Sequence, residues 1–202
     1  MIHASDQTAG PSVLVIGGST RPGRMSPQVA QWVMNHAPSS GGLDLEFVDL
    51  ADWPLPDNEP SIPARGVYIH DQTRAWSRKI GEASAFVFVT PQYNWGYPAA
   101  LKNALDHLYA EWADKPAVIV SYGFHGGGKA AAQLRQVLDG LHMRVAPTAP
   151  ALTLPEEMKA EGASFDLALA AFAAEAPTVR QAFTELAELL HRRAEGHGEP
   201  EL

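Results

Sequence analysis

The sequence predicts an α/β fold in which helices cover both faces of one parallel sheet. Three observations support this: apolar runs of strand length alternate with helical periods, three of these runs are apolar throughout, and 46% of the 202 residues are hydrophobic. Runs that are apolar throughout are typical of strands covered on both faces. Strict alternation of strand and helix favours parallel strands joined by helices. We therefore expect one domain with one sheet.

Five runs are expected to form the strands. The three that are apolar throughout lie at 12–18, 85–90 and 117–122. The other two, 43–50 and 142–147, alternate apolar and polar residues, as partly solvated edge strands do. Placing the alternating runs at the edges gives the strand order 2-1-3-4-5, which is that of a flavodoxin-like three-layer sandwich. In such sheets, ligands bind outside the carboxyl ends of the strands, where the strand order reverses.

Helical periods separate the strands, with apolar residues spaced by three and four. The first expected helix has Ser26 as its N-cap and Pro27 as its first residue, and it ends before Pro38. Three more are expected over 69–83, 101–112 and 134–141, and a last one is expected to be capped by Thr178. The stretch 155–177 has no clear period. Each strand is thus followed by a helix, as the predicted fold requires.

The single flavodoxin-like domain is expected to span 12–193. Residues 1–11 are polar and are expected to form a disordered extension, and 194–202 a disordered tail. The first residues lack the basic region and apolar stretch of a secretory signal. No apolar run reaches the length of a membrane span. A cytoplasmic protein that does not bind membranes is the expectation.

Composition excludes several classes of function. The chain has no cysteine, which excludes disulfides, thiolate catalysis and cysteine-held metals. Its 15 basic and 23 acidic residues give a formal charge of -8, which disfavours nucleic acid as a partner. The histidines show no pair or carboxylate cluster with ligand spacing, so no metal site is expected. Redox chemistry would therefore need a borrowed cofactor.

The loop after the first strand, GGSTRPGRMSP, has the composition of a phosphate site. It holds hydroxyl groups at Ser19 and Thr20 and cations at Arg21 and Arg24, directly before a helix. Backbone N–H groups at a helix N-terminus, with such side chains nearby, bind phosphate esters. Its glycines do not match the spacing G-x-G-x-x-G of dinucleotide sites. We expect a monophosphate here.

The loop after the third strand, PQYNWGYP, is rich in aromatic residues. A planar heterocycle whose phosphate lies at the first loop would reach this loop, where rings can stack on it. Gln92 and Asn94 could then meet its hydrogen-bonding edge. Alternatively, Trp95 and Tyr97 are buried at a subunit contact and only the backbone touches the ligand.

The loop after the fourth strand, SYGFHGGGKAAAQL, resembles two unrelated motifs without matching either. It nearly spells a nucleotide-hydrolase loop, but Ala130 stands where Ser or Thr must hold magnesium. The stretch HGGG from His125 is typical of esterases, yet the required G-x-S-x-G is missing. These glycines instead indicate a backbone that approaches a planar ligand closely.

Three segments in the same order resemble a known family. VIGGSTRPGRMS, PQYNWGYPAALKNALDHL and KPAVIVSYGFHGGGKAAAQLRQVL are together similar to the NADPH-dependent FMN reductases of the flavodoxin-like superfamily, which include quinone, azo-dye and chromate reductases. The resemblance covers roughly 13–147. It implies FMN as cofactor and NAD(P)H as co-substrate.

The resemblance also implies three groups of FMN-binding residues. They are Ser19, Arg21 and Ser26 at the phosphate, with Arg24 adding charge; Pro91, Gln92, Tyr93, Asn94 and Trp95 along the ring and ribityl chain; and Ser121, Gly123 and Gly127 over the pyrimidine end. Gln92 stands where the family commonly has glutamate, which removes a carboxylate near the flavin. No catalytic side chain is assigned, because flavin N5 carries the hydride chemistry.

The expected reaction passes hydride from NAD(P)H through the flavin to a small acceptor: a quinone, free flavin, azo compound or metal oxyanion. Ping-pong kinetics are expected because one open face serves both substrates. Two alternatives remain: a flavodoxin-type electron carrier with little NAD(P)H turnover, or a flavin-binding module whose loops mainly assemble subunits. The resemblance implies a homodimer or homotetramer, with Trp95, Tyr97 and Tyr109 as candidate contacts.

Overall fold

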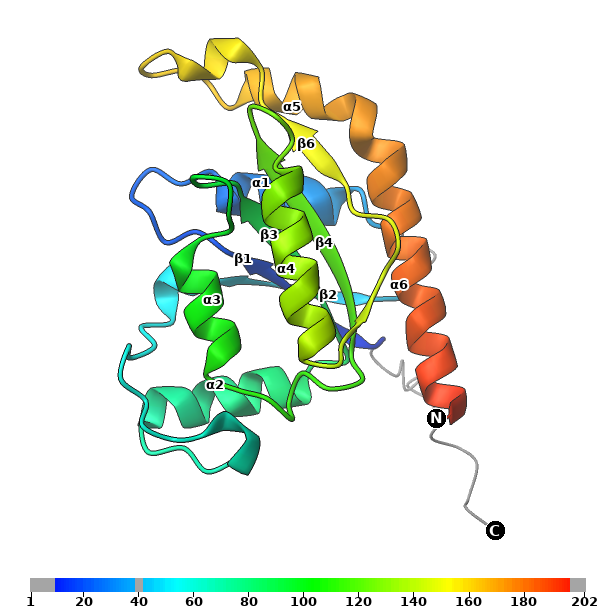
Figure 1. Cartoon of the computed structure of the whole chain (residues 1–202). Coiled ribbons are helices and arrows are strands. Elements are labelled where there is room, and N and C mark those ends of the chain that lie inside the picture. The colour runs from blue at the N-terminus through cyan, green and yellow to red at the C-terminus, as the bar shows by residue number, and fades with distance from the viewer. Residues whose placement is uncertain (1–9, 39–41, 197–202) are drawn as a thin grey trace, which may run out of the picture.

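The computed structural model describes residues 10–38 and 42–196, and these form a parallel sheet with helices on both faces (Figure 1). The strands are β1 (Ser12–Gly17), β2 (Asp44–Asp49), β3 (Ala85–Pro91), β4 (Pro116–Gly123), β5 (Arg144–Val145) and β6 (Ala151–Thr153). Their order is β2-β1-β3-β4-β5, and β6 also pairs with β4. The predicted flavodoxin-like order is therefore confirmed.

The fifth strand differs from its prediction over 142–147. Only Arg144–Val145 pairs with the start of β4, and the chain then leaves the sheet and returns as β6 beside the end of β4. Pro147 and Pro150 lie between the two pieces and have no N–H to donate to a sheet. Because β6 is three residues long, it leaves no periodic signal in the sequence.

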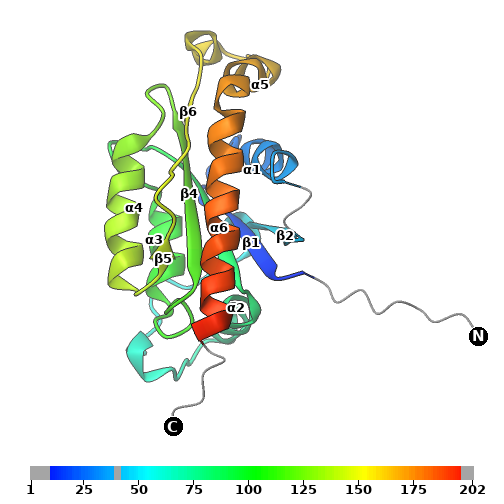
Figure 2. The same ribbon diagram turned by 90° about the vertical axis from the view of Figure 1, so that its right-hand side faces the viewer.

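The two faces of the sheet bury separate apolar clusters. Val13 and Val15 of β1 point toward α1 (Ser26–Asn35), α5 (Asp166–Phe172) and α6 (Ala176–Gly196). Leu14 and Ile16 point toward α2 (Asp71–Glu82), α3 (Ala99–Asp106) and α4 (Gly128–Gly140). This alternation follows from the two-residue period of a strand. Figure 2 shows the resulting layers, with the sheet between α4 and α6.

Several helix ends differ from their predictions, and α4 begins at Gly128, well before the predicted start at 134. Ser26 is the first residue of α1 rather than its N-cap, because Met25 takes that place and the Ser26 hydroxyl bonds elsewhere. The last helix starts at Ala176 rather than after Thr178, since a proline such as Pro177 is tolerated in a first turn. The helix predicted to Trp112 ends at Asp106, and Trp112 is buried from the turn that follows.

The remaining short helices are η2 (Leu50–Asp52), η3 (Pro63–Arg65), η4 (Glu156–Lys159) and η5 (Ala173–Glu175). The last two, with α5, give structure to the unassigned stretch 155–177. Residues 194–196 belong to α6 and not to the predicted tail. The predicted extension 1–11 lies outside the described residues apart from Gly10 and Pro11, and so does 197–202.

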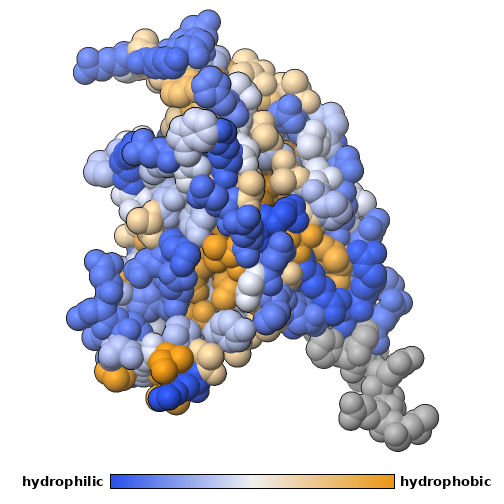
Figure 3. Space-filling model, in the orientation of Figure 1, coloured by the Kyte–Doolittle hydropathy of each residue, from blue (hydrophilic) through white to orange (hydrophobic). Residues whose placement is uncertain are grey.

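The face in Figure 3 is mostly hydrophilic, with apolar side chains gathered between α3 and α4 and along its lower edge. Ile62, Val67 and Ile69 of the connection before α2 are more than half exposed. Within 10–38 and 42–196, none of the helices is both long enough and apolar enough to span a membrane.

Candidate functional site

The carboxyl ends of β1, β3 and β4 meet at one edge of the sheet and border a cleft of about 420 Å³. Sheet register sets this meeting, because Gly17 pairs with Val89, and Pro91 with Tyr122. The cleft is lined by Arg21, Gly23, Arg24, Met25, Pro91, Gln92, Tyr93, Asn94, Tyr122, Gly123, Phe124 and Leu154. Arg21 and Asn94, from the first and second loops, thus share one cleft, as a common ligand requires.

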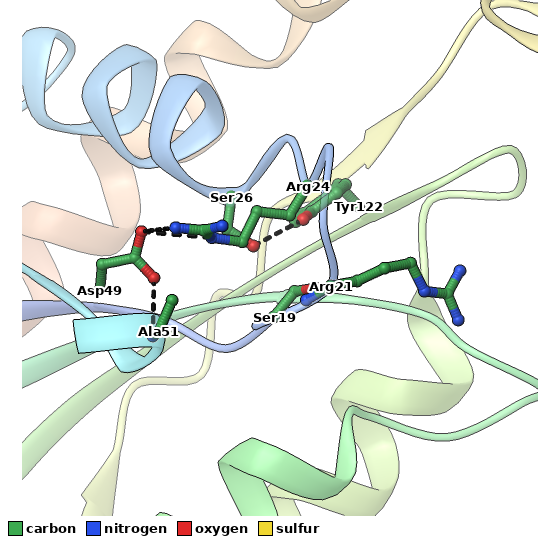
Figure 4. Close-up of polar contacts among 7 residues, drawn as sticks. All are labelled: Ser19, Arg21, Arg24, Ser26, Asp49, Ala51 and Tyr122. Atoms are coloured by element: carbon green, nitrogen blue, oxygen red, sulfur yellow. Dashed lines mark hydrogen bonds and ion pairs between the residues drawn. The ribbon is translucent and has the colours of Figure 1, made fainter. Parts of the chain in front are cut away.

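Arg24 of the first loop is held by an acid at the end of β2. Its guanidinium donates to Asp49 Oδ2 at 2.6 Å and 3.2 Å, and Asp49 Oδ1 accepts the N–H of Ala51 at 3.0 Å (Figure 4). The hydrogen bond to Asp49 is the largest influence on Arg24 and raises its pKa. Much of the charge of Arg24 is therefore balanced within the protein.

Arg21 extends in another direction from Arg24 (Figure 4). Its guanidinium carbon lies 3.9 Å from the centroid of the Tyr93 ring, a cation–π contact. No Asp or Glu among the described residues pairs with it. Arg21 is therefore the cation of this cleft whose charge stays available to an anionic ligand.

Two serines of the first loop are paired with tyrosines of the neighbouring strand ends. Ser19 Oγ lies 2.7 Å from the Tyr93 hydroxyl, and Ser26 Oγ lies 2.8 Å from the Tyr122 hydroxyl. Burial, the largest influence, raises the pKa of Tyr122, so this phenol stays neutral near pH 7. Both serines are fully buried and neither lines the cleft. Their phosphate contacts remain a prediction.

The second loop makes a tight turn at Tyr93–Gly96. The two end residues exchange backbone hydrogen bonds of 2.8 and 3.0 Å, with Asn94 at φ 45° and Trp95 at φ 74°. Hairpin turns of this shape favour Asn-Gly, so Trp95 holds a strained backbone. Trp95 as a whole residue is 64% exposed, and the ammonium of Lys129 lies over its ring. Pro91, Gln92, Tyr93 and Asn94 line the cleft, whereas Trp95 does not.

The third loop packs closely onto the end of β4. Ser121 Oγ donates to the carbonyl of Gly126 at 2.7 Å, which fixes the turn. Gly127 has φ 78°, and a Cβ there would lie 3.0 Å from backbone atoms of Tyr122. Of the three predicted residues here, only Gly123 lines the cleft. Ser121 and Gly127 shape the loop from beneath.

Gln92 connects the second loop to α4. Its Oε1 accepts the backbone N–H of Lys129 at 3.1 Å and of Ala130 at 3.3 Å. These N–H groups belong to the first turn of α4 and have no partner within the helix. Gln92 therefore supplies the cap that Gly127, which has no side chain, does not.

The apolar walls of the cleft were not predicted from sequence patterns. Met25 and Phe124 directly follow the predicted residues Arg24 and Gly123, and this adjacency could have identified them. Leu154 follows β6, for which the sequence had no signal. Tyr122, at the end of β4, was expected as a strand residue only.

A second hollow, of about 430 Å³, lies beside the first loop and is lined by Thr20, Trp53 and Asp57 among others. Its lining includes a carboxylate and no cation, which is the wrong charge for a phosphate. The cleft with Arg21 has cations, planar and apolar walls and no Asp or Glu. The donor set of that cleft fits a planar ligand that carries an anionic group. No acidic or histidine cluster able to hold a metal occurs in the described part of the chain.

A parallel sheet of this order, with a cleft where the order reverses, defines the flavodoxin-like cofactor-binding proteins. The family model of the NADPH-dependent FMN reductases matches residues 11–156. The chain belongs to this family. It is an oxidoreductase that uses FMN as cofactor and NAD(P)H as co-substrate, as predicted.

Curated relatives agree with this family. An NAD(P)H-dependent FMN reductase of Schizosaccharomyces pombe is 56% identical over 155 residues, which cover 75% of this chain and 78% of the relative. One from Saccharomyces cerevisiae is 47% identical, over 65% and 75% of the two chains. A flavoenzyme NAD(P)H:(acceptor) oxidoreductase from Paracoccus denitrificans has the same fold, with a TM-score of 0.66 at 22% identity over 91% and 98% of the chains.

Proposed function

We propose that this enzyme holds FMN in the cleft of Arg21 and Asn94 and transfers reducing equivalents from NAD(P)H to a small acceptor by ping-pong kinetics. The acceptor is a quinone, free flavin, azo compound or metal oxyanion. A relative named NADPH:quinone oxidoreductase, from Arabidopsis thaliana, is 39% identical over 60% of this chain and supports the quinone class. FMN, when bound, supplies the chemistry of hydride transfer.

One observation carries the proposal: a single cleft joins an available cation to a planar ring-binding surface. Arg21 would hold the phosphate by charge-assisted hydrogen bonds, and the amide of Asn94 would meet the ring. Tyr93 would orient Arg21 and Ser19, because its ring lies under the Arg21 guanidinium and its hydroxyl hydrogen bonds with Ser19 Oγ. The buried Ser19, Ser26 and Ser121 would then support the site indirectly, through their hydrogen bonds to Tyr93, Tyr122 and Gly126.

The cleft shared by the loops after β1, β3 and β4 supports the proposal of ping-pong kinetics. NAD(P)H and acceptor would use the same face in turn, so the first product leaves before the second substrate binds. We also propose a homodimer or homotetramer in the cytoplasm, in which the exposed Trp95 and Tyr109 contribute to the subunit contact.

The test mixes purified apoprotein with FMN and then with NADPH without oxygen, and follows the visible absorbance of oxidised flavin. Bleaching within one turnover, and recovery when a benzoquinone is added, is the expected result. A protein that stays yellow would be an electron carrier, and absence of FMN uptake contradicts the flavin site altogether. Initial rates are then measured against NADPH concentration at several fixed concentrations of the benzoquinone. Parallel double-reciprocal lines are expected, and intersecting lines would contradict ping-pong kinetics. Light scattering on the eluting protein measures the subunit number.

A further inference from the structure

Gln92 borders the cleft and at the same time caps α4. Its Oε1 accepts two N–H groups of the first helical turn, from Lys129 and Ala130. An amide turned the other way would place its NH₂ group against these two donors, which is repulsive. The chemistry of the helix end therefore fixes which side of the amide faces α4.

The other side of the amide remains for the cleft. A glutamine side chain has one acceptor oxygen and one NH₂ donor group. With Oε1 used by the helix, Gln92 can act on a ligand only as a neutral donor through Nε2, which no described residue hydrogen bonds. Among the described residues lining this cleft there is no carboxylate at all.

We propose that Gln92 is a positioning residue whose amide NH₂, locked by the N-terminus of α4, donates to the carbonyl edge of the planar ring bound in the cleft. The inference rests on the proposed flavin site. It assigns to Gln92 a preference for the reduced ring, because reduction adds negative charge to that edge and a neutral donor stabilises it.

A carboxylate at the same position separates the two roles of Gln92. In the Gln92→Glu variant, a carboxylate oxygen would accept the same N–H groups and would suit the positive end of the helix dipole. Toward the ring, however, the carboxylate would present negative charge and no donor. Gln92→Glu should therefore preserve the cap and reverse the electrostatic effect on the reduced ring.

The experiment compares Gln92→Glu with Gln136→Glu, which makes the same change on an exposed position of α4 away from the cleft. Three quantities are measured: the melting temperature of the apoprotein, the affinity for oxidised FMN, and the midpoint potential of bound FMN against a reference dye. For Gln92→Glu we expect an unchanged or higher melting temperature. We also expect the ratio of affinities for reduced over oxidised FMN to fall about tenfold or more, which is about 30 mV for two electrons. Gln136→Glu should change neither the melting temperature nor the ratio of affinities.

Gln92→Leu removes the cap and the donor together without adding charge. It should lower the melting temperature of the apoprotein, and it should reduce the affinity ratio by less than Gln92→Glu does. A Gln92→Glu protein that binds FMN with an unaltered ratio overturns the proposal. So does one whose apoprotein melts as low as Gln92→Leu, because the cap would then need the amide. Failure of the unaltered apoprotein to take up FMN is seen before any variant is measured, and it overturns the flavin site and this inference with it.

Discussion

The connection after β2 and the connection after β3 are both polar, but they use their polar groups differently. In the first, residues 50–70, the carboxylate of Glu59 accepts Ser61 Oγ at 2.6 Å and the N–H groups of Ile69 and His70 at 3.2 and 3.1 Å. The carbonyl of Pro56 bonds to Nε2 of His107 at 2.8 Å. These groups are satisfied by other parts of the same chain.

In the second connection, residues 92–98, several groups have no such partner. The Nε2 of Gln92 and the side-chain amide of Asn94 form no hydrogen bond with the described residues, although both residues line the cleft. Trp95 is exposed and has a strained backbone. Arg21, which lies over this connection, has no carboxylate partner among the described residues.

This difference distinguishes polar groups that stabilise the fold from polar groups that are available to bind a ligand. Polar groups that satisfy one another stabilise the apoprotein, because breaking one pair leaves the other member unpaired. Polar groups left along a cleft add stability only when a ligand binds. Changes in the first connection should therefore alter the free energy of unfolding, and changes in the second should alter affinity.

The largest effect is expected for His107→Ala. His107 is 4% exposed and joins Thr73 Oγ1, at 3.0 Å, to the carbonyl of Pro56. Its loss removes a hydrogen-bonding partner from the buried Thr73 hydroxyl and from the partly buried carbonyl of Pro56, and it leaves a cavity. The free energy of unfolding should therefore fall by about 3 kcal/mol. Urea unfolding of the apoprotein measures this. His70→Ala, whose side chain has no such bonds, should stay within about 0.5 kcal/mol.

FMN affinity of the His107→Ala protein should remain within about twofold of the unaltered protein at a temperature where both are folded. A loss of affinity that matches the loss of stability would show that the first connection also shapes the cleft. The contrast between the two connections would then fail.

Arg21→Ala should show the reverse behaviour. We expect affinity for FMN to fall about 10- to 100-fold, the effect of one charge-assisted hydrogen bond to phosphate. The melting temperature of the apoprotein should fall only slightly, because Arg21 gives up only its contact with the Tyr93 ring. Fluorescence titration with FMN measures the affinity. Arg24→Ala is the matched variant, and because Asp49 loses its cation, it should lower the stability of the apoprotein. A larger loss of FMN affinity in Arg24→Ala than in Arg21→Ala would contradict this assignment.

Glu59 makes the stability of the first connection depend on pH. Burial acts to raise the pKa of Glu59, but hydrogen bonds from Ser61, His70 and Ile69 outweigh it and lower the pKa from 4.5 to about 2. A lowered pKa in the folded state means that the stabilisation is complete above pH 4.5 and is lost as the pH falls toward 2.

Comparison with Glu59→Gln isolates this contribution. The variant should be less stable by about 1 kcal/mol at pH 7, a value reduced for solvent exposure, and the difference should shrink between pH 4.5 and 2. Urea unfolding at a series of pH values measures it. A difference that stays constant across this range would mean that the charge of Glu59 is not what its hydrogen bonds require.

Sequence patterns predicted what depends on neighbours along the chain. The periodicities gave the sheet order, and the composition of each loop placed Arg21 and Asn94 at strand ends that prove to share a cleft. Pairings across the chain were beyond this reasoning. The bond between Arg24 and Asp49 joins residues 25 apart, and the hydroxyl that engages Ser26 comes from 96 residues away. No local sequence pattern shows that Arg24, and not Arg21, pairs with an acidic residue.

The smallest expected effect tests the strain at Trp95. A residue with a side chain at φ 74° costs roughly 1 kcal/mol relative to glycine, and glycine is the usual residue at this place in such a turn. Against this, Trp95→Gly gives up the contact with Lys129 and gains freedom in the unfolded chain. These contributions nearly cancel, so the free energy of unfolding, measured by urea unfolding, should change by less than about 0.5 kcal/mol. A loss of more than about 1 kcal/mol would show that the Trp95 side chain stabilises the apoprotein, and the second connection would then resemble the first.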